Sequence, residues 1–219
     1  MTNQNMSSAI MAHRSEASDS LDDFPTPPWA TRALMEHVLG PRHTEHCLEP
    51  AAGRGFMSEA LKEYFGYVQS YDIFDYGYAP VKSFLETDFS NDYYDWVITN
   101  PPFNLAEKFI EKSLDIAEDG IAMLTRTVFI ESAGRYNRLF SKNPPNIVAQ
   151  YVERVPMVRG RVDKKASTAT GYAWMIWSKK NYLFDNTKLV WIPPCRKSLE
   201  KSNDYILPIE RRKSLYYDL

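Results

Sequence analysis

Four consecutive residues, Asn100-Pro101-Pro102-Phe103, combine hydrogen-bond acceptors, a rigid backbone and an aromatic face directly after an apolar run at 96–98. The Asn100 carboxamide oxygen and the Pro101 carbonyl could together accept both hydrogens of one planar amino group, and Phe103 could stack on the ring that carries it. The two prolines limit the motion of such a pocket. The same residues suit the start of a helix, because Asn is a good cap and proline fits a first turn. The segment alone therefore allows two interpretations, an amine-binding pocket and a helix cap.

A second segment, Glu-Pro-Ala-Ala-Gly-Arg-Gly at 49–55, lies where an expected strand gives way to an expected helix. Ligands bind at such points of open α/β sheets. Gly53 and Gly55 allow the backbone to approach a ligand closely, and Glu49 could accept hydrogen bonds from an amine or from hydroxyl groups. A plain turn that needs glycine for its dihedral angles explains the same residues. A nicotinamide site fits poorly, because the third small residue of that motif would fall on Ser58.

Acidic residues lie at or just after the ends of the next two expected strands. Asp72 lies 19 positions beyond Gly53, close to the spacing at which a carboxylate reaches a ribose, and Asp75 competes for this role. Asp88 could bond an adenine amino group while Phe89 packs against the ring. Each residue taken alone could also be an ordinary loop or core residue, so only their combination is informative.

The elements that must position these residues follow from the hydrophobic pattern. Apolar runs of strand length alternate with segments of helical spacing, which predicts a mostly parallel α/β sheet with helices on both faces. The last two strands are joined by a loop with no room for a crossover helix, so we expect an antiparallel hairpin at one sheet edge. Strands are expected at 47–50, 67–73, 83–89, 96–98, 121–130, 147–155 and 172–177, and helices at 30–39, 57–65, 105–117 and 132–140.

Composition limits the class of protein. The chain has 219 residues, of which 44% are hydrophobic and 25% charged, as is usual for one large globular domain. The two cysteines exclude a disulfide framework, and His, Cys and acidic residues show no metal-ligand spacing. There is no apolar run long enough to cross a membrane and no signal-peptide pattern at 1–20. We therefore expect a soluble, cytoplasmic protein without a metal or membrane partner.

Charge is divided unevenly along the chain. Residues 1–119 carry 8 Lys and Arg against 20 Asp and Glu, whereas residues 120–219 carry 18 against 8. Such asymmetry favours an anionic partner such as nucleic acid, although the halves could simply neutralise each other. Arg126 is a further candidate for phosphate contacts or else a buried ion-pair partner. The cations expected to contact phosphates lie in the loop between the last two strands: Arg159, Arg161, Lys164 and Lys165.

Taken in their order and spacing, these elements resemble the class I methyltransferases that use S-adenosylmethionine. The Asn-Pro-Pro-Phe segment resembles the subset that methylates planar amino groups, chiefly the exocyclic amines of adenine or cytosine in DNA. The Pro25-Thr26-Pro27-Pro28 segment resembles the additional cofactor-binding element of the amino-methyltransferases with this motif order, which are mostly adenine enzymes. The ordered chain is also similar to small methyltransferases encoded by phages and prophages. The resemblance covers roughly residues 22–178.

The resemblance implies a Rossmann-like class I methyltransferase fold over residues 22–180, after a mobile tail at 1–21 and before a C-terminal extension at 181–219 that packs on the same domain. It implies methyl transfer from S-adenosylmethionine to an exocyclic amine of DNA, adenine in the first place, on a base flipped from the duplex or single-stranded. RNA, a protein glutamine amide and a catalytically silent nucleic-acid-binding module are the alternatives. The residues implied for catalysis are Asn100, Pro101, Pro102 and Phe103, and those implied for the cofactor are Thr26, Glu49, Pro50, Ala51, Gly53, Gly55, Asp72, Asp88 and Phe89.

Overall fold

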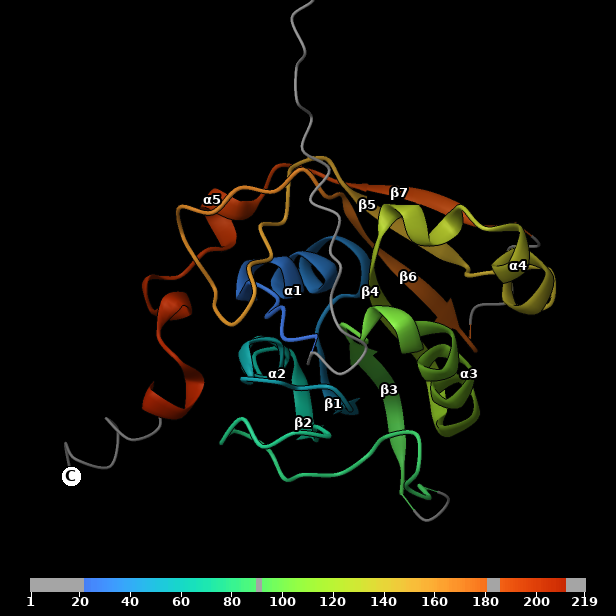
Figure 1. The fold of residues 1–219 in the computed structure, drawn as a ribbon, viewed down its shortest axis with the longest axis horizontal. Coiled ribbons are helices and arrows are strands. Elements are labelled where there is room, and N and C mark those ends of the chain that lie inside the picture. The colour runs from blue at the N-terminus through green and yellow to red at the C-terminus, as the bar shows by residue number, and fades with distance from the viewer. Residues whose placement is uncertain (1–21, 90–91, 181–185, 212–219) are drawn as a thin grey trace, which may run out of the picture.

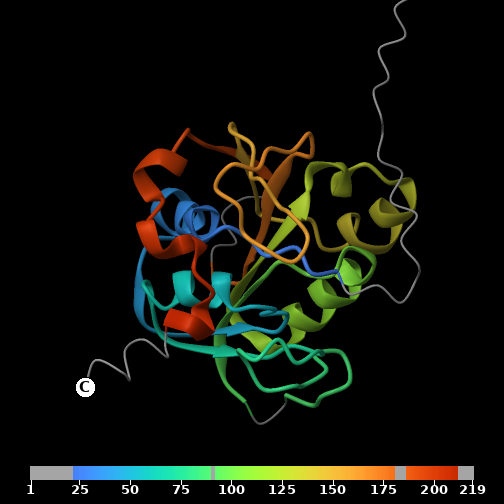
Figure 2. The same ribbon diagram turned by 60° about the vertical axis from the view of Figure 1, so that its left-hand side comes forward.

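The computed structural model describes residues 22–89, 92–180 and 186–211, so the tail expected at 1–21 lies outside the described residues. In these residues one seven-stranded sheet has the order β2-β1-β3-β4-β6-β5-β7, and helices cover both its faces (Figures 1 and 2). The strands are β1 (Arg42–Glu49), β2 (Phe65–Ser70), β3 (Tyr94–Thr99), β4 (Ala117–Arg126), β5 (Ile147–Tyr151), β6 (Tyr172–Ser178) and β7 (Lys188–Ile192). The α-helices are α1 (Pro28–Leu34), α2 (Phe56–Leu61), α3 (Ala106–Ile116), α4 (Ala133–Arg135) and α5 (Arg196–Leu199).

The pairing of the strands confirms the mixed sheet. Strands β2, β1, β3 and β4 run parallel, β6 is antiparallel to both β4 and β5, and β7 pairs in parallel with β5. The chain leaves β1 toward β2 on one side and later returns to place β3 on the other side. The carboxyl ends of β1 and β3 therefore lie next to each other at the point where the strand order reverses, which is where open α/β sheets bind ligands.

Two hydrophobic cores hold the three layers together. All six residues of β3 are buried, as expected for a central parallel strand covered on both faces. Alternation along β3 sends Trp96 and Ile98 into the core with α1 and α2, and sends Val97 into the core with α3. Figure 1 shows α1 and α2 on one face of the sheet and α3 and α4 on the other.

The expected strand at 83–89 is wrong. Phe84 and Phe89 are buried as an apolar run predicts, but the segment forms turns instead of a ladder. The physical reason is the Lys112 ammonium group of α3, which donates hydrogen bonds to the carbonyls of Leu85 (3.2 Å) and Thr87 (2.5 Å). A side chain thus satisfies backbone acceptors that would otherwise need a neighbouring strand.

Two further boundaries differ from the expectation. Strand β4 ends at Arg126, and Thr127–Ile130 forms a 3-10 turn where the apolar pattern predicted a strand to residue 130. The antiparallel pair of β5 and β6 is present, but β7 was not predicted and lies outside it at the sheet edge. Leu189 and Trp191 of β7 are exposed, so its pattern lacks the burial that marks a core strand.

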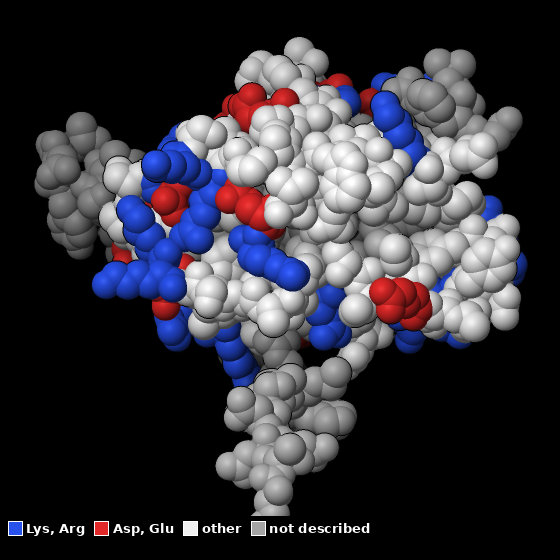
Figure 3. Space-filling model, turned by 90° about the horizontal axis from the view of Figure 1, so that it is seen from above, with Lys and Arg blue, Asp and Glu red and all other residues white. Residues whose placement is uncertain are grey.

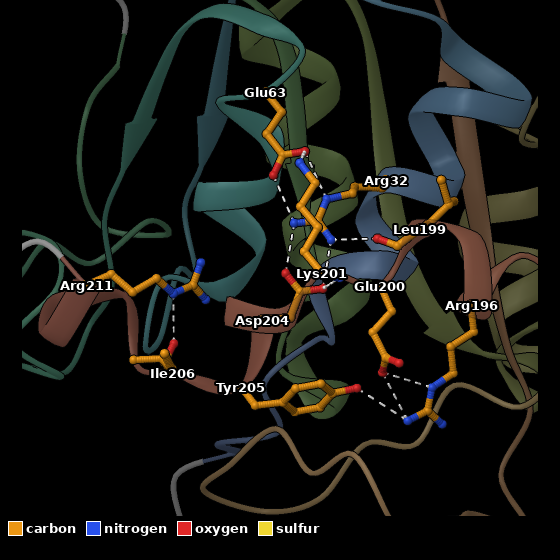
Figure 4. Close-up of polar contacts among 10 residues, drawn as sticks. All are labelled: Arg32, Glu63, Arg196, Leu199, Glu200, Lys201, Asp204, Tyr205, Ile206 and Arg211. Atoms are coloured by element: carbon orange, nitrogen blue, oxygen red, sulfur yellow. Dashed lines mark hydrogen bonds and ion pairs between the residues drawn. The ribbon is translucent and has the colours of Figure 1, made fainter.

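A buried arginine fastens the C-terminal part of the chain to the first helix (Figure 4). The Arg32 guanidinium on α1 is 3% exposed and forms ion pairs with Asp204 at 2.7 Å and Glu63 at 2.9 Å. It also donates to the Leu199 carbonyl at 2.8 Å, so all five of its N–H groups have an acceptor. Complete pairing of this kind is what makes a buried charge tolerable.

We predict that Asp204→Ala will lower the free energy of unfolding by about 3–5 kcal/mol, because it leaves a buried guanidinium with two unfilled donors. Lys201→Ala is the matched control: Lys201 bonds the same Glu63 but is 53% exposed on its side chain, so about 1 kcal/mol or less is expected. Urea denaturation measures both variants. Equal losses would mean that Asp204 contributes no more than a surface ion pair.

Candidate active site

The glycine turn after β1 is docked on the end of β2. The Gly53 N–H donates to the Asp72 carboxylate at 2.7 Å, and Gly55 closes the turn through a bond to the Ala52 carbonyl at 2.8 Å. Gly53 has a φ of +50°, and a Cβ at this position would meet no atom within 4 Å. A Cβ on Gly55 would lie 2.3 Å from the Tyr78 ring. Gly53 thus borders open space that a ligand can use, whereas Gly55 makes room for a side chain.

The two candidate acids have different surroundings. Asp72 is buried, accepts the N–H groups of Gly53 and Phe74 (2.9 Å), and burial raises the pKa of its carboxyl group. Asp75 is exposed and faces a cavity of about 390 Å³, within the size range of small-molecule sites. Asp72 therefore braces the turn, and of these two acids only Asp75 borders the cavity. The cavity is lined by Asp23, Arg54, Phe74, Asp75, Tyr76 and Arg159.

Two other implied cofactor residues place polar atoms in the interior. Glu49 ends β1 with 2% exposure and accepts a hydrogen bond from the Ser58 hydroxyl, which in turn accepts one from Ser70 at 2.8 Å. Burial raises the pKa of Glu49 to about 8. The Thr26 hydroxyl is buried and has no hydrogen-bond partner among the described residues. The remaining positions of this segment, Pro50 and Ala51, are the first two residues of the loop after β1.

The Asp88–Phe89 pair does not line the cavity. Phe89 is buried among Phe84 and Tyr94, at centroid distances of 5.6 and 6.2 Å. The Lys82 ammonium group lies 4.4 Å from the Phe89 ring centroid. A cation thus lies against the ring for which the sequence predicted contact with adenine. Phe89 packs in the hydrophobic core that also contains residues of α3.

Asn100 lies directly after β3, and its amide is oriented by the N-terminal segment. Its Nδ2 donates to the Phe24 carbonyl at 3.1 Å, and its Oδ1 is buried with no partner among the described residues. Neither the 3-10 turn Phe103–Leu105 nor α3 has a side-chain cap. The helix-cap interpretation of Asn100 is therefore wrong, and an acceptor oxygen is held away from solvent beside Pro101 and Phe103.

Residues 22–24 join the separate motifs, which sequence reasoning missed. Asp22 accepts the Phe103 N–H at 2.8 Å, and Asp23 forms an ion pair with Arg54 of the glycine turn at 2.8 Å. The Asp23 carbonyl also accepts the Gly160 N–H at 2.8 Å. Two adjacent acids before the proline-rich segment were the available signal. These bonds bring together the glycine turn at 53–55, the segment at 100–103 and the loop at 159–165, called the cationic loop below.

The cationic loop does not project from the sheet edge as expected. The bond from Gly160 to Asp23 folds it back, and Arg159 lines the cavity together with Arg54. Arg161 pairs with Asp163 at 3.2 Å but remains exposed, as are Lys164 and Lys165. Figure 3 shows Lys and Arg gathered on the side of the molecule that carries this loop and α5, with acidic groups between them.

A second cavity of about 90 Å³ lies beside the Asn-Pro-Pro-Phe segment, at the carboxyl end of β4. It brings together the start of α3, the end of β4 and the 3-10 turn that follows. Its lining is Pro101, Phe103, Ala106, Leu124, Thr125, Arg126, Val128, Phe129 and Arg135. Phe103 therefore borders a pocket whose lining includes no residue of the glycine turn.

Within the described ranges no helix has the length and apolar character needed to span a bilayer. The same part of the chain contains no group of three or more His, Cys, Asp or Glu side chains arranged to hold a metal ion.

No protein-family model matches the chain, and no curated protein matches it significantly. Solved structures do match. The M protein of the type I restriction enzyme EcoKI has a TM-score of 0.57 at 13% identity, covering 88% of this chain and 54% of its own. The methyltransferase subunit of a type I restriction-modification system from Streptococcus thermophilus has a TM-score of 0.54 at 13% identity, covering 91% and 54%. A candidate RNA methyltransferase from Pyrococcus horikoshii has a TM-score of 0.52 at 18% identity, covering 72% and 87%.

This chain has the Rossmann-like methyltransferase fold. It spans about half the length of the type I modification subunits that it matches. The fold expected from the sequence is thereby confirmed. At these levels of identity the likeness concerns the fold, and activity has to be argued from the site.

The pKa of Glu49 leads to a pH-dependent prediction. A carboxyl group whose pKa is raised on folding stabilises the protein below its unfolded-state pKa, and this stabilisation is lost as pH rises through about 8. Glu49→Gln removes the titration and keeps an acceptor for Ser58. We expect the difference in melting temperature, variant minus parent, to rise by a few degrees between pH 5 and pH 9. This corresponds to a relative gain of about 1–3 kcal/mol in the free energy of unfolding of the variant.

Glu86→Gln, at an exposed position, is the control for the loss of one carboxyl group as such. If the difference between Glu49→Gln and the parent is the same at pH 5 and pH 9, Glu49 is ionised throughout this range in the folded protein.

Proposed function

We propose that the protein is an S-adenosylmethionine-dependent methyltransferase that transfers a methyl group to an exocyclic amine of DNA, adenine in the first place. The observation that carries the proposal is the Oδ1 atom of Asn100, buried and unpartnered among the described residues while Nδ2 is fixed by the Phe24 carbonyl. A buried acceptor without a donor is costly, and it persists where a ligand supplies the donor.

The glycine turn supports the cofactor assignment. The open space beside Gly53, the buried carboxyl group of Glu49 and the cavity bordered by Asp75 offer a backbone cradle, an acceptor for a cation and an acceptor for hydroxyl groups. These features complement two groups of S-adenosylmethionine, its amino-acid ammonium group and the hydroxyl groups of its ribose. When bound, the cofactor supplies a methyl group on a sulfonium centre, ready for displacement. In our proposal Gly53, Glu49 and Asp75 orient it.

The acceptor assignment rests on what the Asn-Pro-Pro-Phe segment can do to an amine. An exocyclic amine is a weak nucleophile, because its lone pair is delocalised into the ring. Asn100 Oδ1 and the Pro101 carbonyl would each accept one N–H, which favours a pyramidal nitrogen with an available lone pair. Phe103 would hold the ring plane by stacking. Alignment of the nitrogen with the methyl carbon then accounts for most of the catalysis, and no histidine or cysteine is needed.

The DNA assignment draws on the similarity to type I restriction-modification methyltransferase subunits and on the cationic loop. A base within a duplex cannot reach Asn100, so it has to be flipped out, and phosphate contacts elsewhere offset the unstacking. The candidate RNA methyltransferase among the similar structures makes RNA the second candidate substrate. The same amine chemistry would also suit a protein glutamine amide. A substrate panel of duplex DNA, single-stranded DNA, RNA and protein, with radiolabelled cofactor, separates these from a silent binding module.

We predict that Asn100→Ala will keep cofactor affinity within about threefold and lower kcat by about 10²-fold, because it removes an acceptor used mainly in the transition state. Gly53→Ala should instead weaken cofactor binding. The added Cβ fills the open space, so the affinity for S-adenosylmethionine should fall at least about tenfold. Alanine is preferred to a branched residue because the φ of +50° already strains any side chain. Calorimetry measures binding, and methyl incorporation measures kcat.

These two variants control for each other. Transfer at the parent rate by Asn100→Ala would show that Asn100 is not the amine acceptor. Unchanged cofactor affinity in Gly53→Ala would show that the glycine serves only the backbone turn. Absence of S-adenosylmethionine binding by the parent protein would overturn the proposed function as a whole.

The cationic loop generates a separate prediction. Replacement of Arg161, Lys164 and Lys165 by alanine should weaken DNA binding and flatten the dependence of log Kobs on log salt, by roughly 0.9 for each phosphate that the variant no longer neutralises. Cofactor affinity should not change, since these three side chains point into solvent. Arg159→Ala is tested apart, because Arg159 lines the cavity and should alter cofactor affinity.

A triple alanine variant at Arg42, Lys179 and Lys180 is the matched control. These cations lie where β1 begins and β6 ends, at the opposite end of the parallel strands. They should leave the salt slope unchanged. If the loop variant has a lower melting temperature but keeps the parent salt slope, the loop neutralises the acidic half of the chain and does not bind DNA.

A further inference from the structure

Arg126 is placed against the aromatic ring of the candidate acceptor site. It is the last residue of β4, and its guanidinium carbon lies 4.3 Å from the centroid of the Phe103 ring. The side chain is half-buried, and within the described residues its guanidinium makes no hydrogen bond and no ion pair. The sequence allowed two roles for Arg126, contact with a phosphate or a buried ion pair. The described residues supply no anion for the ion pair.

A neighbouring arginine shows what a purely structural role looks like. Arg135 stacks on Phe129 at 4.0 Å from its centroid, donates to the Phe129 carbonyl and pairs with Glu107 at 3.3 Å. Arg135 lines the same cavity as Arg126. The two cations share the stacking geometry, but only Arg135 has acceptors for its N–H groups in the described structure. Arg126 thus presents a fork of unused donors at the edge of the pocket.

The lining of the pocket contains a second polar group without a protein partner among the described residues. Thr125, next to Arg126 and 2% exposed, has a buried hydroxyl group with no partner among the described residues. Its position in the lining of the cavity provides a second polar atom that a bound group could satisfy. The cavity measures about 90 Å³ while the guanidinium lies on the Phe103 ring. A planar base that stacks on this face of Phe103 has to take the place of Arg126.

We propose that Arg126 is a substrate-positioning residue with two positions: it stacks on Phe103 in the free protein, and it moves to a backbone phosphate of the target nucleotide when the base takes the ring face. This inference rests on the proposed function. A guanidinium is planar, which suits the first position, and its donors match two phosphate oxygens, which suits the second. The stack of the base on Phe103 replaces the stack of Arg126 on the same ring, and the unused N–H donors of Arg126 bind the phosphate.

The exchange explains why the cation has no anionic partner among the described residues. An ion pair such as that of Arg135 with Glu107 would hold the guanidinium in place and oppose its release. Stacking on an aromatic ring at a solvent-accessible position is a weak attraction that a base can replace. The arrangement also keeps the Phe103 ring covered until a nucleotide arrives, which limits the apolar surface offered to other molecules.

The test compares Arg126→Gln with Arg126→Lys, using a single-stranded oligonucleotide that contains adenine. We expect Arg126→Gln to flatten the slope of log Kobs against log salt by about 0.7, which corresponds to one phosphate on a single strand. Its KM for the oligonucleotide should rise about five- to tenfold, with kcat within twofold of the parent and cofactor affinity unchanged. Arg126→Lys keeps the charge and should retain the parent slope.

Arg42→Gln is the matched control, because Arg42 also stacks on an aromatic ring, 4.6 Å from the Trp96 centroid. It is paired with Glu45 and lies at the start of β1, away from the pocket. Removal of one stacked charge should there leave the slope and the KM unchanged.

A direct readout is the NMR resonance of the Arg126 Nε–H group, assigned through Arg126→Lys. In the free protein the Phe103 ring should shift it upfield, and saturation with the oligonucleotide should remove this shift. An upfield shift that persists in the complex, or a salt slope and KM of Arg126→Gln equal to those of the parent, overturns the inference. The proposed function is judged separately, by whether the parent protein methylates the oligonucleotide at all.

Discussion

The parallel pairing of β1 with β3 is the constraint on which the candidate site depends. The register sets Leu48 opposite Val97, so the two strands end one residue apart at the same edge of the sheet. The glycine turn and Asn100 are about 50 positions apart in sequence, and this pairing alone makes them neighbours. Residues 22–24 then bond to both loops and fix their relative position. A shift of one register step would send every following side chain to the opposite face and separate the two halves of the site.

The site keeps several polar atoms away from water without a protein partner. Thr26, Asn100 and Thr125 each contribute an unpartnered oxygen within the described residues, and Glu49 is a buried acid. Such atoms cost free energy in the unliganded protein. The surrounding layers tolerate the cost because both cores are tightly closed around β3 and β4. The buried guanidinium of Arg32, by contrast, is fully paired. In the proposed function, a bound ligand supplies partners for the oxygens of Asn100 and Thr125 at the carboxyl ends of β3 and β4.

Much of the fold could be predicted from the sequence because the central strands are buried on both faces and read as apolar runs. The pattern failed where a side chain replaced a strand neighbour, as Lys112 does for residues 83–89, and where an edge strand kept exposed residues, as in β7. Within the site, the glycine turn and Asn100 could be found from residue type and spacing. The division of roles between Asp72 and Asp75, the place of Arg159 and the stacking of Arg126 could not, because each depends on contacts between residues far apart in sequence.

The pairing of Arg32 with Asp204 has a consequence for folding during synthesis on the ribosome. The two residues are 172 positions apart, so the acceptor that completes the pairing of the guanidinium does not exist until the segment around Asp204 has been made. Until then α1, whose seven residues are all buried in the final fold, carries a charge that keeps it hydrated. Helix α1 is therefore expected to dock late, after the sheet has formed beneath it.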